Sequence, residues 1–137
     1  MIRIDNKLIN ELLDKALVAE RKRTNFDMRS SNLDNSQRML NALQPGTIVP
    51  IHRHPNSNEN VILLCGQLDE VIYDCSGVEV ERIHLDPSVG NYGCVVPIGV
   101  WHTVEVHKPS IIFEAKDGKY GEDGSESFET YKKSQEL

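Results

Sequence analysis

Short β-type segments separated by turn-forming residues make up most of the chain from Gln37 onward. Their alternating apolar side chains predict strands near residues 37–43, 47–54, 59–65, 67–74, 78–85, 93–96, 101–107 and 110–116. Glycine or proline separates most of these segments, and we expect Gly66 and Lys108-Pro109 to end strands. No helical crossover interrupts the series. We therefore predict an all-β domain, built as a sandwich or a closed barrel.

An amphipathic helix is expected before the β-type segments. Apolar residues recur at helical spacing between Leu8 and Leu17, and Asp5 or Asn6 is available as the N-cap. The basic run Arg21-Lys22-Arg23 follows, where positive charge complements the helix dipole. The sequence therefore predicts one N-terminal helix.

The whole chain divides into three parts within one domain. These are the N-terminal helix (1–23), the β-barrel (24–116) and a polar C-terminal tail (117–137). The barrel begins with a polar stretch, 24–35, which is expected to form a loop with a short edge strand. The tail is glycine-rich and acidic, and we expect it on the surface or across a partner subunit.

Three histidines and one glutamate have the spacing of a metal site. His52 and His54 are two positions apart on a predicted strand, so they point to the same face. The four turn-forming residues after them let the chain reverse and bring back Glu59, and a later turn precedes the strand that carries His102. Neutral imidazoles and a carboxylate suit a divalent transition metal. The alternative is ordinary surface or core histidines, but the combined spacing favours a mononuclear metal site on these four residues.

The strand that begins at Glu59 supports an interior position for the site. Its metal-side face continues through Val61 and Leu63, as expected inside a small barrel. The opposite face is also apolar, at Ile62 and Leu64. We therefore expect a second layer over that face, either the helix or another subunit.

The same residues resemble the two motifs of the cupin superfamily. The first motif, Gly-x5-His-x-His-x4-Glu-x6-Gly, matches without a gap from Gly46 to Gly66. The second motif matches at its core, Pro97-x-Gly99-x-x-His102, but Gly90 lies one residue too far away and Val106 stands where asparagine is usual. The resemblance implies a cupin barrel (a double-stranded β-helix or jelly roll) with its metal at His52, His54, Glu59 and His102.

A narrower resemblance covers most of the chain. The stretches 37–47, 52–55, 99–103 and 113–120 are similar to the WbuC family of cupin-fold metalloproteins. That family is found with bacterial surface-polysaccharide (O-antigen) gene clusters, so the resemblance implies a role in O-antigen biosynthesis. Cupins commonly pair through outer strands, which implies a homodimer.

Further site residues are expected around the metal. Three imidazoles and one carboxylate leave one or two coordination positions open on Fe, Mn, Zn or Ni, where a small-molecule ligand could bind. Glu114 and Lys116 share a strand face and are catalytic candidates at the barrel mouth; the alternative is an exposed ion pair. Tyr120 could close the mouth as a phenolic donor. Asn41 or Arg38 could orient a sugar hydroxyl or a carboxylate.

The two remaining histidines, His84 and His107, have no partner at ligand spacing. We expect them to be ordinary surface or rim residues.

Three functions fit these features, and the sequence leaves open whether the protein is an enzyme. The first is a metal-dependent protein that acts on or binds a small polar molecule, such as a sugar or nucleotide-sugar. The second is an Fe(II)-dependent dioxygenase. The third is a non-catalytic metal- or ligand-binding module.

The amino-acid composition limits the classes of binding partner that we expect. The formal net charge is −6, with 21 acidic and 15 basic side chains, which argues against nucleic acid or an anionic membrane as the main partner. No apolar run is long enough to cross a bilayer, and the N-terminus lacks the pattern of a signal peptide. The three cysteines form no Cys-x-x-Cys pair, as expected for reduced thiols in a cytoplasmic protein.

Overall fold

The computed structural model describes residues 1–119 and 122–136. In chain order the elements are α1 (Asn6–Val18), β1 (Arg23–Asp27), β2 (Ser36–Leu43), β3 (His52–Arg53), β4 (Glu59–Tyr73), β5 (Glu79–Leu85), the 3₁₀ turn η1 (Pro87–Val89), β6 (Gly93–Val96), β7 (Trp101–Asp117), β8 (Glu126–Ser127) and α2 (Phe128–Ser134).

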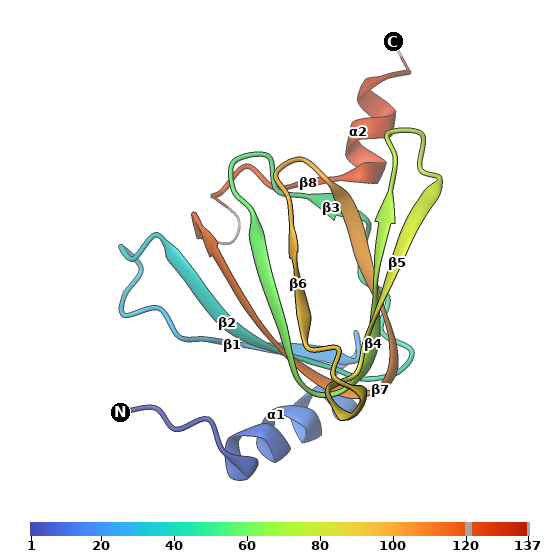
Figure 1. Ribbon diagram of the computed structural model, residues 1–137. Coiled ribbons are helices and arrows are strands. Elements are labelled where there is room, and N and C mark those ends of the chain that lie inside the picture. The colour runs from blue at the N-terminus through green and yellow to red at the C-terminus, as the bar shows by residue number, and fades with distance from the viewer. Residues whose placement is uncertain (120–121, 137) are drawn as a thin grey trace.

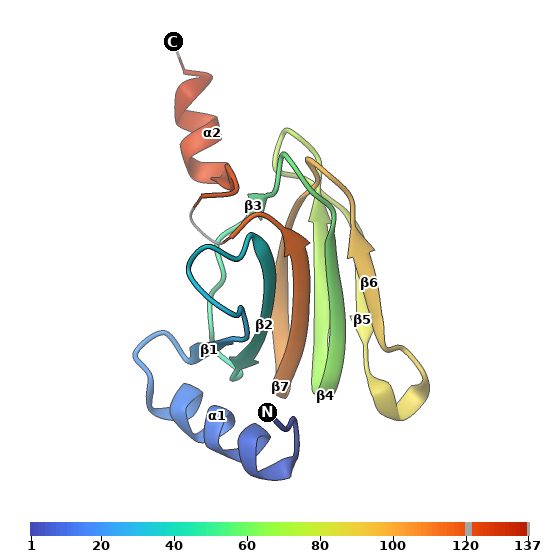
Figure 2. The same cartoon turned by 90° about the vertical axis from the view of Figure 1, so that its left-hand side faces the viewer.

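The strands form one strongly curled antiparallel sheet (Figures 1 and 2). The long strands β4 and β7 pair at its centre, β2 and β1 extend the sheet beyond β7, and β5 and β6 both pair with β4. The short strands β3 and β8 pair with each other at the rim, where β3 also pairs with β7. Figure 1 shows α1 at one end of the curled sheet and α2 at the other. The prediction of an all-β barrel with one N-terminal helix is confirmed.

Two apolar cores hold the barrel and the helix. The first fills the inside of the curled sheet and is formed by Leu43, Val61, Leu63, Leu68, Leu85 and Ile112. In the second, Leu12 and Ala16 of α1 pack against Leu40, Ala42 and Ile111 on the outer side of the sheet. Asp5 caps α1 by accepting a hydrogen bond from the backbone N–H of Leu8 at 3.1 Å. The helix therefore forms a second layer, over β2 and β7.

The helix does not cover the outer face of the strand that begins at Glu59. Ile62 and Leu64 on that face are 43% and 38% exposed, whereas Val61 and Leu63 on the inner face are almost fully buried. The predicted inner face is thus confirmed. Within the described chain, the expected second layer does not extend over Ile62 and Leu64.

Gly66 lies within β4 instead of ending a strand. Its φ is +95°, and a Cβ built there would lie 2.3 Å from the carbonyl oxygen of Pro109 in β7. The β4–β7 register shifts three times between Leu63 and Leu68, so both strands bend together through β-bulges. The predicted strand ends at Gly66 and at Lys108-Pro109 are therefore wrong, because glycine allows a bulge where we expected a turn.

The strand predicted at 47–54 is reduced to His52 and Arg53. Side chains bind the backbone before it: Thr47 Oγ1 donates to the carbonyl of Arg21 at 2.6 Å, and Thr103 Oγ1 donates to the carbonyl of Val49 at 2.5 Å. These bonds replace the strand ladder and fix the approach of the chain to His52.

The C-terminal segment contains a strand and a helix that the sequence did not reveal. Phe128 of this segment packs edge-to-face against Trp101 and Tyr131 packs against it at a tilt, with ring centroids 5.2 Å from that of Trp101 in each case. The guanidinium of Arg53 lies over the Trp101 ring at 4.4 Å and also pairs with Glu126 at 2.8 Å. Aromatic packing and a cation–π contact therefore hold the segment against the rim of the barrel. In the described chain, neither helix is long and apolar enough to span a bilayer.

Candidate metal centre

The rim of the barrel brings together the four predicted metal ligands. His52 on β3 pairs directly with His102 on β7, and Glu59 begins β4. The imidazole ring centroids of His52 and His102 are 4.3 Å apart, and that of His54 is 5.1 and 5.4 Å from them. One ring nitrogen from each histidine lies within 4.8 Å of the others, which is close enough to hold one ion.

All three imidazoles are oriented by a hydrogen bond at Nδ1. His52 Nδ1 donates to the carbonyl oxygen of Pro50 at 2.8 Å, and His102 Nδ1 donates to that of Val100 at 3.0 Å. Because a carbonyl only accepts, the proton of each ring is on Nδ1 and the lone pair is on Nε2. Metal-binding histidines are held in the same way.

His54 is held in the same tautomer by two consecutive side-chain hydrogen bonds. Its Nδ1 lies 2.7 Å from Ser125 Oγ, and that hydroxyl lies 2.5 Å from Asp123 Oδ2. The Asp123 carboxylate only accepts, and it also accepts from Lys116 Nζ at 2.5 Å. Ser125 must therefore donate to Asp123 and accept from Nδ1–H of His54, which leaves the Nε2 lone pair of His54 facing inward.

The inward nitrogens meet a buried carboxylate. Glu59 is 4% exposed, and its oxygens lie 2.8 Å from His54 Nε2 and 3.5 Å from His102 Nε2. Within the described chain, neither Nε2 has a hydrogen-bond partner of good geometry. Buried polar atoms are rarely left in this state, so their convergence beside a carboxylate fits a divalent cation.

The charge states agree with this donor set. Burial, and then the neighbouring His102, lower the pKa of His52 to about 4, so its imidazole is neutral near pH 7. Burial acts to raise the pKa of Glu59. The neighbouring imidazoles of His102 and His54 outweigh burial and hold the pKa of Glu59 below the usual range. The neutral imidazole of His52 and the ionised carboxylate of Glu59 are the forms that coordinate a metal.

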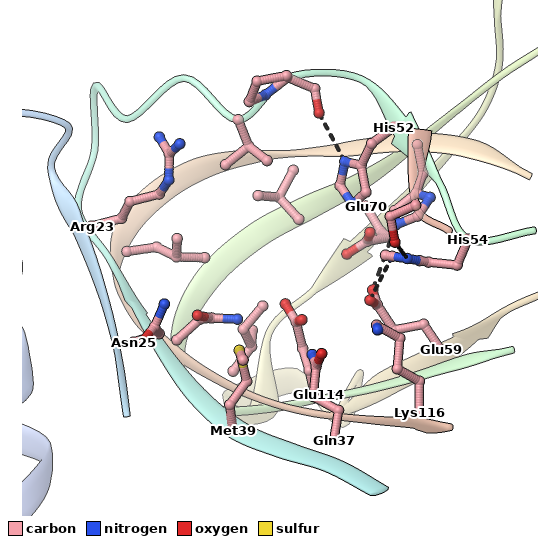
Figure 3. A pocket seen from close by; sticks show the side chains of 18 of the residues that line it. Arg23, Asn25, Gln37, Met39, His52, His54, Glu59, Glu70, Glu114 and Lys116 are labelled. Atoms are coloured by element: carbon pink, nitrogen blue, oxygen red, sulfur yellow. Dashed lines mark hydrogen bonds and ion pairs between the residues drawn. The ribbon is translucent and has the colours of Figure 1, made fainter. Parts of the chain in front are cut away.

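A cavity of about 370 Å³ opens beside the four residues (Figure 3). Its polar lining includes Glu70, Glu114, Gln37 and Asn41. Burial, together with the charge of Glu59, raises the pKa of Glu114 to about 8 although Asn41 donates a hydrogen bond to it. Burial likewise raises the pKa of Glu70 well above its usual value. Two protonated carboxylic acids therefore face the cavity near neutral pH.

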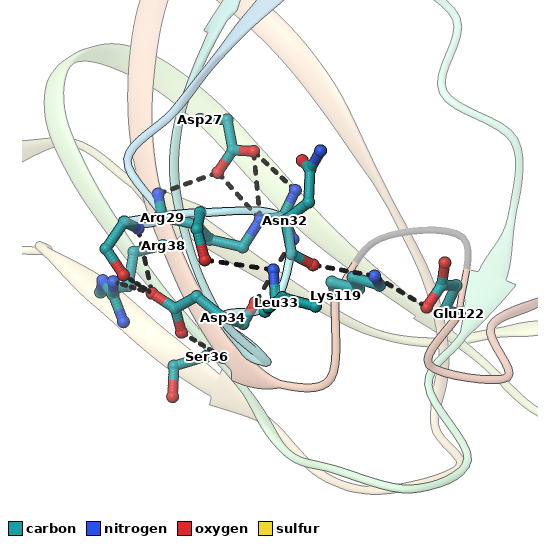
Figure 4. Close-up of polar contacts among 11 residues, drawn as sticks. Asp27, Arg29, Asn32, Leu33, Asp34, Ser36, Arg38, Lys119 and Glu122 are labelled. Carbon is teal, nitrogen blue, oxygen red and sulfur yellow. Dashed lines mark hydrogen bonds and ion pairs between the residues drawn. The ribbon is translucent and has the colours of Figure 1, made fainter.

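The other predicted site residues have distinct positions. Glu114 faces the cavity and is not part of an exposed ion pair. Lys116 is buried, and its ammonium binds Asp123 and the carbonyl of Gly118. Tyr120 lies outside the described residues. Asn41 lines the cavity, whereas Arg38 pairs with Asp34 at 2.5 Å in a polar network beside the loop after β1 (Figure 4).

Sequence reasoning missed Glu70 and Ser125. Counting alternate residues from Glu59 places Glu70 outside, but the bulges around Gly66 reverse this parity, so Glu70 points inward. Ser125 is separated from His54 by 71 positions. The spacing of residues along the sequence cannot predict a contact between two residues so far apart.

The comparisons with known proteins establish the family. A family model described as Domain of unknown function (DUF6016) matches residues 4–85, more than half of the chain. The chain belongs to this family. No protein with a curated description matches it.

Solved structures establish the fold of this DUF6016 protein. An uncharacterized conserved protein with a double-stranded β-helix domain from Klebsiella pneumoniae has a TM-score of 0.64 at 16% identity, covering 93% of this chain and 97% of that one. An oxalate oxidase in complex with the substrate analogue glycolate has a TM-score of 0.61 at 15% identity, covering 90% of this chain and 64% of that one. The oxalate decarboxylase of Bacillus subtilis, whose structure concerns its Mn(II) centres, has a TM-score of 0.59 at 19% identity.

These likenesses confirm a cupin fold, the double-stranded β-helix that the motifs imply. The match to the decarboxylase covers 80% of this chain but only 28% of the decarboxylase chain. At such identities the likeness concerns the fold alone.

Proposed function

We propose that His52, His54, Glu59 and His102 hold one divalent transition metal, and that the metal binds a small polar molecule in the adjoining cavity. One observation carries this proposal: the Nδ1 atoms of all three imidazoles are engaged, and their Nε2 lone pairs converge beside a buried carboxylate. Fe, Mn, Zn and Ni all accept such a donor set.

The structural neighbours support a small oxygen-rich ligand. The decarboxylase contains Mn(II) centres, and the oxidase binds glycolate, a hydroxy acid. When bound, the metal would polarise an oxygen atom of the ligand. The cavity of about 370 Å³ is large enough for a small polar molecule.

Glu114 is the residue proposed for proton transfer. Its carboxyl faces the cavity, and a pKa of about 8 lets it give or take a proton near neutral pH. Glu70 would remain protonated and donate a hydrogen bond. For Lys116 we propose a positioning role, since its ammonium is bound to Asp123 and Gly118. Tyr120 as a phenolic donor stays a prediction.

A sugar or nucleotide-sugar of O-antigen biosynthesis is the finer proposal, and it rests on the resemblance to the WbuC family. Its proposed setting is a homodimer in the cytoplasm. An Fe(II)-dependent dioxygenase is the alternative reaction, since the oxidase neighbour shares the fold. Oxygen uptake by Fe(II)-loaded protein with a candidate ligand separates the two, because the dioxygenase consumes O₂ and loses activity with Zn(II).

Electron paramagnetic resonance of Mn(II)-loaded protein tests the metal proposal. We expect a bound Mn(II) signal that changes when glycolate is added. The His52→Ala/His54→Ala variant should lose this glycolate-sensitive signal, whereas the Ser134→Ala variant, altered at an exposed hydroxyl of α2, should keep it. Circular dichroism confirms that both variants fold. A bound signal of unchanged intensity in the His52→Ala/His54→Ala variant would overturn the proposal.

A further inference from the structure

A second cluster of metal-binding side chains lies on the outer face of the barrel. Asp69 on β4 pairs with His84 on β5 and with Glu105 on β7, and His107 lies two residues beyond Glu105 on the same face. Glu70, next to Asp69, points into the cavity, so Asp69 points away from it. Three adjacent strands therefore bring one carboxylate and two imidazoles together, across the sheet from the central site.

Asp69 is the centre of this cluster. Its Oδ1 lies 2.7 Å from His84 Nδ1, and its Oδ2 lies 3.1 Å from His107 Nε2. One ligand atom from each of the three residues lies within 4.8 Å of the others. Both histidines lie on the surface, as we expected, but their contact with Asp69 is made across strands and so does not appear in the spacing along the sequence. All five histidines of the chain thus belong to one of two three-residue clusters.

The local charge favours a cation. Asp69, Glu79 and Glu105 all pair with a single guanidinium, that of Arg82. With neutral imidazoles, three negative charges and one positive charge leave a net −2. Asp69 accepts a hydrogen bond from Arg82 at 3.0 Å, and its two oxygens face the two imidazoles.

The burial of the carboxylate and the partial exposure of the two imidazoles suit a metal site. The Asp69 side chain is only 9% exposed although its strand face points outward, because His84, His107 and Arg82 cover it. The two imidazoles themselves are 48% and 43% exposed, so their rings can adjust by small rotations. A metal would replace the two shared protons, and water could fill its remaining positions.

We propose that Asp69, His84 and His107 form a second divalent metal site, solvent-accessible and selective for imidazole-binding ions such as Zn(II). The site joins β4 and β7 to β5, which in the described chain pairs with β4 alone. It is independent of the central site, since it shares no residue with it and faces the other side of the sheet.

The number of Zn(II) ions bound per chain, compared between the wild type and a variant without the two histidines, tests this proposal. Chelator-stripped protein is titrated with Zn(II) by calorimetry, and the His84→Ala/His107→Ala variant should bind one equivalent fewer than the wild type. This difference is expected whether or not the central site takes Zn(II), so failure of one site does not hide the other. The single variant His84→Ala should weaken binding at this site by at least about tenfold.

Arg82→Gln is the matched control, since it alters the same surface and keeps all three ligands. It should retain the wild-type stoichiometry and bind Zn(II) at least as tightly, because Arg82 no longer occupies Asp69 Oδ2. Histidine ring NMR signals of the wild type give a readout that needs no variant: those of His84 and His107 should shift when Zn(II) is added in excess over both sites. Equal stoichiometry in wild type and the double variant, or unshifted signals, would overturn the proposal.

Discussion

The hydroxyl of Ser125 offers a way to weaken the central site without removing any proposed ligand. In Ser125→Ala, two hydrogen bonds disappear, one to His54 Nδ1 at 2.7 Å and one to Asp123 Oδ2 at 2.5 Å. His54 is 7% exposed, so water cannot readily replace the lost partner. The imidazole is then free to change tautomer, and its Nε2 lone pair is no longer held toward the metal.

The magnitude follows from this contact. Loss of a residue that orients a metal ligand typically weakens metal affinity about 10- to 100-fold, or roughly 1.4–2.7 kcal/mol. The metal-free protein should lose about 1–3 kcal/mol in the free energy of unfolding, because the buried Nδ1–H of His54 then has only the more distant Asp123 carboxylate, at 3.3 Å, as a partner. Competition with a chromophoric chelator measures the affinity, and urea denaturation measures the stability.

Two further variants distinguish the loss of His54 orientation from a nonspecific effect of substituting a serine. Ser125→Thr keeps the hydroxyl and should restore most of the affinity. Ser134→Ala removes an exposed serine hydroxyl that bonds only to near neighbours in α2 among the described contacts, donating to the carbonyl of Tyr131 and accepting from Gln135 Nε2, and it should behave like the wild type. If Ser125→Ala binds metal within twofold of the wild type, or if Ser125→Thr is equally impaired, the proposed orientation of His54 is incorrect.

Two other predictions concern the barrel. Gly66→Ala should lower the free energy of unfolding by more than about 2 kcal/mol in urea denaturation, since its φ is +95° and its Cβ would collide with Pro109. Gly99→Ala, with no atom within 4 Å of the added Cβ, should cost less; an equal loss would refute the steric explanation. Glu114 has a raised pKa, so the folded state binds more protons than the unfolded one between its ordinary value of 4.5 and about 8. Metal-free protein should therefore lose stability as the pH rises through this window, and Glu114→Gln should flatten the profile; an unchanged slope would contradict the raised pKa.

Local spacing was sufficient to predict the four residues at the rim. His52 and His54 share a face because side chains alternate on an extended segment, and a short turn is enough to return Glu59. His102 needs only a strand that pairs with β3, and the structure provides it. The apolar inner face at Val61 and Leu63 likewise follows from alternation.

Features that depend on pairing across the sheet could not be predicted in this way. Gly66 has the composition of a turn, and only its contact with Pro109 distinguishes a bulge. That bulge reverses the faces of β4, so the inward position of Glu70 and the outward position of Asp69 are hidden from counting. Ser125 meets His54 only because β8 pairs with β3.

Anomalous scattering is the most direct test of the central metal site. Crystals of protein purified without chelator would be measured at the Mn, Fe, Ni and Zn absorption edges. We predict a strong peak at the rim, about 2.1 Å from Nε2 of His52, His54 and His102 and in contact with the Glu59 carboxylate, separate from any peak at the cluster of Asp69, His84 and His107. Crystals that show no anomalous peak among these four side chains, even after soaking in each metal, would contradict the account.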